Sequence, residues 1–406
     1  MPLDNDFVIN RSPTVSVIMA VHNGEPYLAA AIESVLQQTC RDFEFIIVND
    51  ASTDSSRQTL GAYAAADPRL VLANNAANIG MAASLNKALG LARGRYVARH
   101  DADDLSAPTR LQEQVMYLEQ HPEVGLLSTR VQIIDEAGQP LSVDPYAGGF
   151  DNAALQSELL DHNSICHGSV MLRCGCLQAV GGYDESLELT EDYDLWLRLA
   201  EATGLAKLTS QLYQYRQHAG SISAQRRGQQ MFAQARTLEK ALRRRHGANP
   251  PFGLVKHVAD SYRQAADFFV QQGDLRAARQ CLTQAITLSP ELFASRAVYW
   301  PLPPGDGDLA FTESVLGDLA RTGPYRQVRR ALRSRVHMRR VFAAARRGDL
   351  KELQAHLWAG IYQDPRWMLN RGVWSLAARA LLGRPWRRPL PVPVPTPSPA
   401  PSDKPQ

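Results

Sequence analysis

Short apolar runs alternate with stretches of helical periodicity over the first hundred positions of the chain. Five of the seven residues of Val15–Val21 are apolar, which predicts a buried strand. From Pro26 onward the apolar residues recur at helical spacing and predict a helix, with Leu28, Ile32, Val35 and Leu36 on one face. The alternation continues with further strands and a helix, at Phe43–Val48, around Leu70–Leu72, over Met81–Ala92 and at Tyr96–Ala98.

This order of strands and helices is typical of a mainly parallel sheet with right-handed crossovers. We therefore predict an α/β fold, with a Rossmann-like, mainly parallel sheet flanked by helices, over residues 13–224. Ligands of such sheets bind at the carboxyl ends of the strands. The predicted strands end at Val21-His22-Asn23, at Asn49-Asp50 and at His100-Asp101, so polar and acidic side chains gather where a ligand is expected.

The pattern becomes helical throughout after residue 224, which predicts an all-α domain over residues 225–383. Two segments align in it without gaps: Gly-Asp-Leu at 273 and again at 348, each followed by a Pro 17 residues after the Gly. The 75-residue offset is about two periods of a helical repeat of roughly 34–38 residues. Ala265–Pro290 resembles a tetratricopeptide helix hairpin. The alternative is that the two Gly-Asp-Leu segments are unrelated helix starts and not members of a repeat. Residues 384–406, rich in Pro, are expected to form a disordered tail.

The 406 residues are enough for two domains, and 45% hydrophobic residues with 21% charged ones exclude a wholly disordered chain. The net charge of +3 hides a division, because residues 1–224 carry 14 basic and 28 acidic groups (14 − 28 = −14). The remaining residues carry 30 basic and 13 acidic groups (30 − 13 = +17). An acidic half and a basic half predict two different partners.

Ten arginines lie in the basic half between residues 321 and 347: Arg321, Arg326, Arg329, Arg330, Arg333, Arg335, Arg339, Arg340, Arg346 and Arg347. Together with the nearby Trp358, Trp367, Trp374 and Trp386, they could dock on anionic lipid as a peripheral membrane contact. They could equally form a solvated helical face that pairs with the acidic half. We expect no nucleic-acid partner, because no nucleic-acid-binding motif accompanies the charge.

Five scattered cysteines, an odd number, argue against a disulfide framework and favour a reducing compartment. No stretch has the roughly 18–20 uncharged apolar residues of a transmembrane helix, and no signal-peptide core precedes the first strand. We therefore expect a cytoplasmic protein, either free or at the inner face of a membrane.

An acidic cluster, Asp101-Ala-Asp103-Asp104, follows the fourth predicted strand. Clustered carboxylates repel one another unless a cation lies among them, and an oxygen-seeking ion such as Mg²⁺ or Mn²⁺ suits this donor set. The alternative is a solvated, helix-capping acidic turn before Pro108.

The order of motifs resembles a family 2 glycosyltransferase with the GT-A nucleotide-sugar fold, over about residues 13–224. The motifs that carry the resemblance are Val15-Ser-Val-Ile-Met-Ala-Val-His-Asn-Gly24, Ser34-Val-Leu-Gln-Gln-Thr39, Phe43-Glu-Phe-Ile-Ile-Val-Asn-Asp-Ala-Ser-Thr-Asp54, Asn78-Ile-Gly80, Gly94-Arg-Tyr-Val-Ala-Arg-His-Asp-Ala-Asp-Asp104, Asn163-Ser-Ile-Cys-His167, Gly181-Gly-Tyr-Asp184, Glu191-Asp192-Tyr-Asp194 and Tyr215-Arg-Gln-His218 before Ser221-Ile-Ser. Each motif is weak alone, whereas the ordered series is specific.

The resemblance implies a donor site at the strand ends. Asp50 would accept from the nucleobase imide N–H, and the remaining donor contacts would come from Ala20, Val21, His22, Asn23, Asn78 and Gly80. Asp101 and Asp103 would be the Asp-x-Asp pair, with Asp103 as the direct metal ligand and Asp101 nearer the ribose. The sequence departs from the family twice: Ala20–Asn23 stands where a Pro and a Tyr are frequent, and Asn49 replaces a frequent Asp.

The resemblance also implies a base on the acceptor side. Asp192 would be the general base, and its place in the first turn of a helix predicts that the helix dipole helps to keep it ionised. Glu191 would orient the acceptor, although both it and Asp194 could be ordinary first-turn residues. His218 would contact the metal or the diphosphate, or make a structural hydrogen bond instead.

The sequence therefore predicts an inverting, metal-dependent transfer of a sugar from a nucleotide-diphosphate donor to a hydroxyl of a glycan, a lipid-linked or a protein-linked acceptor. A UDP-sugar is the first choice of donor, with dTDP and GDP open. The alternative is a catalytically inactive nucleotide-binding scaffold. A nucleotidyltransferase would need a Gly-rich, basic loop after the first strand, which Val21-His-Asn-Gly-Glu-Pro26 does not supply.

Overall fold

The structure is a computed structural model, and it describes residues 12–141, 146, 148–221, 225–295, 300–303 and 307–382. The chain divides into two compact units, Met1–Ser261 and Tyr262–Gln406, and the division falls inside helix α10 (Phe252–Gln271). The tail predicted over 384–406, Trp386, and Ile222 and Ser223 of the last family motif lie outside the described residues.

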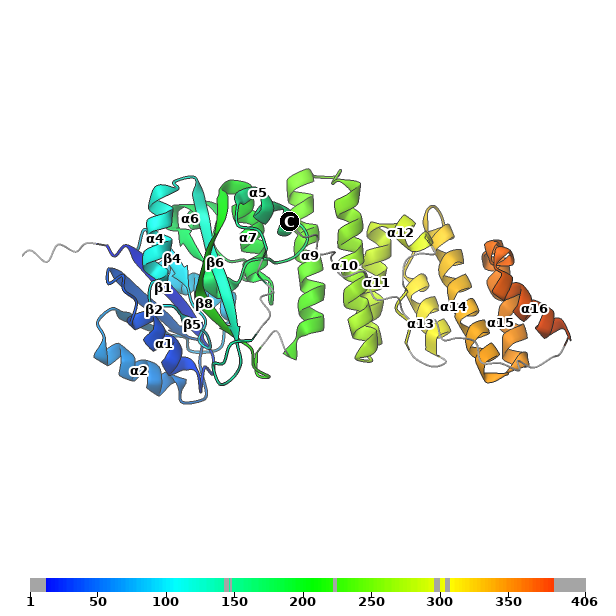
Figure 1. Ribbon diagram of the computed structural model, residues 1–406, viewed down its shortest axis with the longest axis horizontal. Helices are drawn as coiled ribbons and strands as arrows, with labels where there is room; N and C mark the ends of the chain where they lie inside the picture. Colours follow the sequence, from blue (N-terminus) through cyan, green and yellow to red (C-terminus); the bar gives the residue numbers. More distant parts are fainter. Residues whose placement is uncertain are drawn as a thin grey trace, which may run out of the picture. The chain divides into compact units, whose positions relative to one another are not determined.

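The described residues of the first unit contain one eight-stranded sheet in the order β3-β2-β1-β4-β7-β6-β8-β5 (Figure 1). β1, β2, β3 and β4 pair in parallel, as the alternating pattern predicts, and β6 is parallel to β8. β7 is antiparallel to both of its neighbours, and β5 is antiparallel to β8. The strands are β1 (Val15–Val21), β2 (Phe43–Asn49), β3 (Leu70–Asn74), β4 (Tyr96–Arg99), β5 (Leu105–Ser106), β6 (Val124–Ile134), β7 (Met171–Arg173) and β8 (Gly204–Arg216).

Helices connect these strands and cover the sheet. They are α1 (Leu28–Leu36), α2 (Ser56–Ala66), α3 (Met81–Leu91), α4 (Arg110–Gln120), α5 (Asn152–Glu158), the 3-10 helix η1 (His167–Ser169), α6 (Cys174–Val180) and α7 (Glu191–Ala202). The boundaries of β1, β2, β3, β4 and α3 agree with the predicted ones to within two residues, because each follows from a local apolar pattern.

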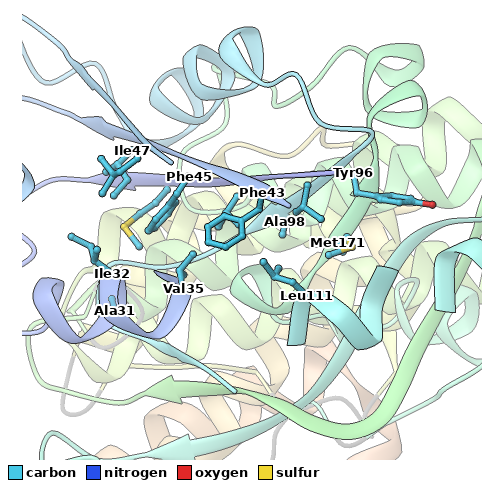
Figure 2. Close-up of a cluster of buried hydrophobic side chains, with 14 of the residues drawn as sticks. Ala31, Ile32, Val35, Phe43, Phe45, Ile47, Tyr96, Ala98, Leu111 and Met171 are labelled. Atoms are coloured by element: carbon cyan, nitrogen blue, oxygen red, sulfur yellow. The ribbon is translucent and has the colours of Figure 1, made fainter. Parts of the chain in front are cut away.

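The core of this unit lies between the sheet and helices α1 and α4. Figure 2 shows alternate residues of β2, namely Phe43, Phe45 and Ile47, beside the α1 residues Ile32 and Val35. Every residue of β2 is buried, so both faces of the strand are covered. A continuous apolar run is therefore required at this strand, as in other central parallel strands.

Helix α9 (Arg227–His246) belongs to the same compact unit as the sheet, because it packs against α7 (Figure 1). The sequence pattern changes to helical after residue 224, whereas the unit that contains the sheet continues to Ser261. Helical periodicity in the sequence does not determine which of the two hydrophobic cores a helix packs against.

The second unit is helical throughout its described residues. Its helices after α10 are α11 (Leu275–Leu288), α12 (Pro290–Ala294), α13 (Asp308–Gly317), α14 (Tyr325–Arg347), α15 (Leu350–Gln363), the 3-10 helix η3 (Pro365–Leu369) and α16 (Arg371–Leu382). One core cluster joins α14, α15 and α16, with Val341, Leu357 and Leu376 among its buried members.

The two Gly-Asp-Leu segments adopt the same local structure. Gly273 and Gly348 have φ of 80° and 76°, the left-handed conformation that glycine adopts without strain. The next residues, Asp274 and Asp349, cap α11 and α15, each of 14 residues, by accepting from the backbone N–H three positions on. The predicted helix starts are confirmed, and the tetratricopeptide likeness stays a prediction.

Most of the ten arginines between residues 321 and 347 make contacts inside the second unit. Arg333 pairs with Glu313 at 2.6 Å and Arg340 with Asp308 at 2.6 Å, while Arg347 pairs with Glu352. Three more donate to backbone carbonyls of this unit: Arg329, Arg335 and Arg339. Arg321, Arg326, Arg330 and Arg346 are the remaining members of the set.

No helix within the described ranges is both long and apolar enough to span a membrane. The five cysteines are all free, in agreement with the expected lack of a disulfide framework.

Candidate active site

The carboxyl ends of β1, β2 and β4 meet at one edge of the sheet. The Asp50 backbone N–H donates to Val21 O at 2.7 Å, and the His100 backbone N–H donates to Ile18 O at 3.0 Å. The three polar strand ends predicted from the sequence therefore form one surface, at the edge where parallel sheets bind ligands.

Asp50 organises the loop that follows β3. Its side chain is 3% exposed and accepts from the backbone N–H groups of Ile79 and Gly80, both at 2.9 Å, and from Asn75 Nδ2 at 2.8 Å. Gly80 has φ of 90°, which favours glycine, and its N–H also donates to Asn78 Oδ1 at 3.1 Å. The structure thus brings together Asp50, Asn78 and Gly80, and much of the acceptor capacity of Asp50 is directed to this loop rather than to a ligand.

His22 and Asn23 join the loops after β1 and β2. His22 Nδ1 lies 2.8 Å from Asp50 O, and Asn23 Oδ1 accepts from the Thr53 backbone N–H at 2.8 Å. Asn23 and Ala51 have φ of 56° and 53°, so the chain turns sharply on both sides of this contact. The side chains of His22 and Asn23 are exposed at the ends of buried strands, whereas Ala20 and Val21 belong to β1 itself.

The three aspartates after β4 have three different environments. Asp104 is fully buried and accepts from the Arg216 backbone N–H at 2.7 Å, and burial, followed by the nearby charge of Asp103, raises its pKa to about 8. Asp101 is paired with Arg99. Asp103 Oδ2 lies 3.0 Å from His218 Nε2, and both side chains are partly exposed. Two of the three predicted metal ligands are therefore adjacent, and the third is held by an arginine.

Asp103 and His218 supply two of the ligands that an Mg²⁺ or Mn²⁺ ion requires. The described residues contain no group of three or more His, Cys, Asp or Glu placed to hold a metal. One carboxylate and one imidazole can nevertheless hold such an ion when phosphate oxygens and water complete the coordination, which is the usual arrangement for nucleotide-bound Mg²⁺. The Tyr27 ring packs against His218, with the two ring centroids 5.1 Å apart.

Glu191 and Asp192 form the first turn of α7. Asp192 accepts from Asn163 Nδ2 at 2.9 Å and from the Tyr193 backbone N–H at 2.7 Å. Burial nevertheless raises the pKa of Asp192, although these hydrogen bonds and Arg99 act in the opposite direction. Burial and the charge of Asp192 raise the pKa of Glu191 to about 7. Burial is therefore the largest influence on the Asp192 carboxyl, and the expected help from the helix dipole stays a prediction.

Arg99 is the site residue that sequence reasoning missed. Its side chain is 1% exposed at the end of β4, it pairs with Asp101, and its positive charge lowers the pKa of Glu191, Asp192 and Asp104 against the effect of burial. One buried cation therefore acts on both the acidic turn and the start of α7. A basic residue at the last position of an otherwise apolar strand was the available signal.

Comparisons with known proteins concern the family of the chain. The profile of glycosyl transferase family 2 matches residues 16–179. A putative glycosyltransferase of Bacillus subtilis, EpsE, is 39% identical over 48% of this chain and 69% of its own length. An uncharacterized glycosyltransferase of Methanocaldococcus jannaschii is 38% identical over 46% of this chain and 64% of its own length.

The fold is also similar to that of a solved structure. The crystal structure of S. aureus TarS in complex with UDP has a TM-score of 0.53, with 16% identity, over 80% of this chain and 92% of that chain. At this identity the likeness concerns the fold alone. It is that of a mostly parallel sheet flanked by helices, followed by a helical region.

Proposed function

The chain belongs to glycosyltransferase family 2, and from that premise we propose that it moves a sugar, with inversion, from a nucleotide-diphosphate donor to a hydroxyl of a glycan, lipid-linked or protein-linked acceptor. The observation that carries the proposal is the position of Arg99. This buried cation pairs with Asp101 on the donor side and acts on Glu191 and Asp192 on the other side. The groups proposed to bind the donor and the groups proposed to act on the acceptor therefore both interact with Arg99.

Asp192 is the proposed general base. As the acceptor oxygen bonds to the anomeric carbon, the bond from that carbon to the diphosphate oxygen breaks, and the carboxylate takes the hydroxyl proton. A carboxylate with a raised pKa is better matched to this proton transfer than an ordinary one. Asn163 donates to Oδ2 of this carboxylate at 2.9 Å, and Glu191 is proposed to orient the acceptor.

Asp103 and His218 are the groups proposed to hold Mg²⁺ or Mn²⁺, with Asp101 nearer the ribose. The bound ion would supply positive charge to the leaving diphosphate. The loops held by Asp50, His22 and Asn23 are proposed to receive the nucleobase through exposed backbone and side-chain groups. UDP is the nucleotide to test first, since the S. aureus protein of similar fold was crystallised with UDP.

A peripheral contact with anionic lipid is the proposed role of the C-terminal face. Four large apolar side chains that are 48% to 85% exposed lie within a short stretch of α15, η3 and α16: Trp358, Tyr362, Leu369 and Trp374. Arg371 is exposed in the same stretch, and Arg366 is also exposed but pairs with Asp364 at 2.9 Å. Exposed aromatic groups beside cations are the combination that binds a lipid interface. Because most α14 arginines are engaged elsewhere, the aromatic groups carry this proposal.

A thermal-shift screen of nucleotide sugars, each with and without Mn²⁺, tests the function. We expect one donor to raise the unfolding temperature of the full chain only when Mn²⁺ is present, and the same donor to be slowly hydrolysed. A nucleotide that binds while no donor is hydrolysed or transferred would favour the inactive scaffold. If a dTDP-sugar or a GDP-sugar is bound and hydrolysed instead of a UDP-sugar, the proposed reaction stands and only the identity of the nucleobase changes.

A further inference from the structure

The segment that leads into α7 has a strained backbone. Leu189, two residues before Glu191, has φ of 73°, which a leucine seldom adopts. Such a conformation persists only where neighbouring structure holds it. The side chains of Glu191 and Asp192 directly follow this turn. Residues that stabilise the backbone of the turn therefore also orient the carboxylate of Asp192.

Helix α9 contacts the turn at its buried centre. Thr237 Oγ1 lies 2.9 Å from Thr190 Oγ1, and each side chain is 1% exposed. The hydroxyls of two buried threonines satisfy each other, and loss of either leaves the other without that partner. Thr190 is the residue immediately before Glu191.

Cations of α9 contact the chain on both sides of the turn. Before it, Lys240 Nζ lies 2.7 Å from Asp184 Oδ2, and Arg226, the residue immediately before α9, pairs with Glu188. After it, Glu201 pairs with Arg244 at 2.7 Å and with Arg245 at 2.8 Å. The bonds from Lys240 and Ser186 lower the pKa of Asp184 to about 2.

Lys240 also faces a buried carboxylate of α7. Asp194 is 1% exposed, and its Oδ1 has no hydrogen bond. The cations of α9 nearest to Oδ1 are Lys240 Nζ at 3.5 Å and Arg244 Nη1 at 3.9 Å. Arg198 of α7 itself pairs with the other oxygen, Oδ2, at 2.6 Å, so the cations of α9 complete the compensation of this buried charge and tie the start of α7 to α9.

We propose that α9 is a positioning element of the transfer site, in which Thr237 and Lys240 hold the Leu189–Thr190 turn and the start of α7 so that Asp192 faces the acceptor. The inference rests on the proposed function of Asp192. It assigns a role to a helix that the sequence pattern groups with the helical domain. It also means that some of the basic residues after residue 224 pair with acidic residues of the segment 1–224.

The test compares Thr237→Val and Lys240→Gln with Arg243→Gln. Arg243 lies on the same helix, is 68% exposed and pairs only with Glu239 of α9 in the described contacts, so its replacement removes an equal charge away from α7. We expect the first two variants to lower kcat for transfer by about 10-fold to 100-fold, because small misplacements of a catalytic group have effects of this size. The KM for the donor and the binding of UDP should stay unchanged. Lys240→Arg should restore kcat.

Hydrogen exchange of the full chain provides a readout that does not require activity. In Thr237→Val and Lys240→Gln, backbone amides of residues 185–193 should exchange faster than in Arg243→Gln, while those of β1 and β2 should not change. Unchanged exchange in that segment would overturn the inference, as would a kcat equal to that of Arg243→Gln. An inactive wild type with faster exchange in the variants would contradict the proposed function and leave the positioning role intact.

Discussion

His218 Nε2 lies 3.0 Å from Asp103 Oδ2, although 115 residues separate the two in sequence. The contact joins the end of β8 to the acidic turn after β4. It places an imidazole nitrogen and a carboxylate oxygen side by side, while the neighbouring Asp101 is held by Arg99. Of the residues predicted to bind a metal, Asp103 and His218 are the two that contact each other.

Asp103→Asn should weaken Mn²⁺-dependent binding of UDP by about 10-fold to 100-fold, the loss that even outer partners of a metal produce when removed. His218→Ala should reduce the same binding. Titration calorimetry of UDP with and without Mn²⁺ measures the effect. Glu123→Gln, which removes an exposed carboxylate immediately before β6, is the control. Unchanged Mn²⁺ dependence in both site variants would place the metal elsewhere.

Asp104→Asn should behave differently from Asp103→Asn. Because burial raises the pKa of Asp104 to about 8, the folded protein keeps this carboxyl mostly protonated at pH 7, and asparagine retains an oxygen for the Arg216 N–H. The free energies of unfolding of the two proteins should differ by less than about 1 kcal/mol near pH 4 in metal-free buffer, where the carboxyl is largely protonated in both the folded and the unfolded chain, and Asp104→Asn should be the more stable protein at pH 7.

The sign of the pH effect follows from the same shift. A raised pKa in the folded state contributes stability at low pH that is lost as the pH rises toward about 8. Denaturant unfolding at pH 6 and pH 9 should therefore show the wild type losing stability relative to Asp104→Asn. A large loss of stability in the variant at pH 7 would mean that the ionised form is the native one.

Asp192→Asn should reduce transfer by about 100-fold to 10,000-fold, the usual contribution of a general base, while UDP binding stays nearly intact. Steady-state transfer rates and UDP titrations measure the two effects separately. Equal loss of transfer and of UDP binding would contradict the assignment of Asp192 as the base.

Asn163→Ala should shift the acid limb of kcat/KM to higher pH. Transfer requires ionised Asp192, so the rate falls as the pH drops through its raised pKa. The Asn163 amide favours the ionised form, and its removal should raise that pKa further. A pH profile from pH 4 to 9 for both proteins gives the comparison, and identical limbs would mean that another group controls this limb.

Trp358→Ser and Trp374→Ser should each weaken binding to anionic vesicles by about 10-fold, since burial of a large apolar side chain is worth about 1.5–3 kcal/mol. Co-sedimentation of the full chain with vesicles of phosphatidylglycerol, and with neutral phosphatidylcholine for comparison, measures this. Leu275→Ser, in α11 and 38% exposed, serves as the matched control. Equal binding by all four proteins, or none to either vesicle, would remove the lipid contact.

The amino-acid sequence by itself determined the strands and helices of the first hundred residues and the start of two C-terminal helices. β1 begins and ends at Val15 and Val21 as predicted, and Asp274 and Asp349 cap their helices. These features depend on neighbours within a few positions, through apolar periodicity and capping hydrogen bonds. The meeting of three polar strand ends at one edge followed from parallel topology alone.

Only the tertiary structure decided how the site residues differ from one another. Asp101, Asp103 and Asp104 are close in sequence, yet one meets a buried arginine, one a histidine and one the backbone of β8. Contacts between distant segments set these environments. They also set the burial of Arg99 and the packing of α9 against α7. Ionisation depends on burial and on charges that arrive from elsewhere in the chain, so local pattern could name the carboxylates but not their states.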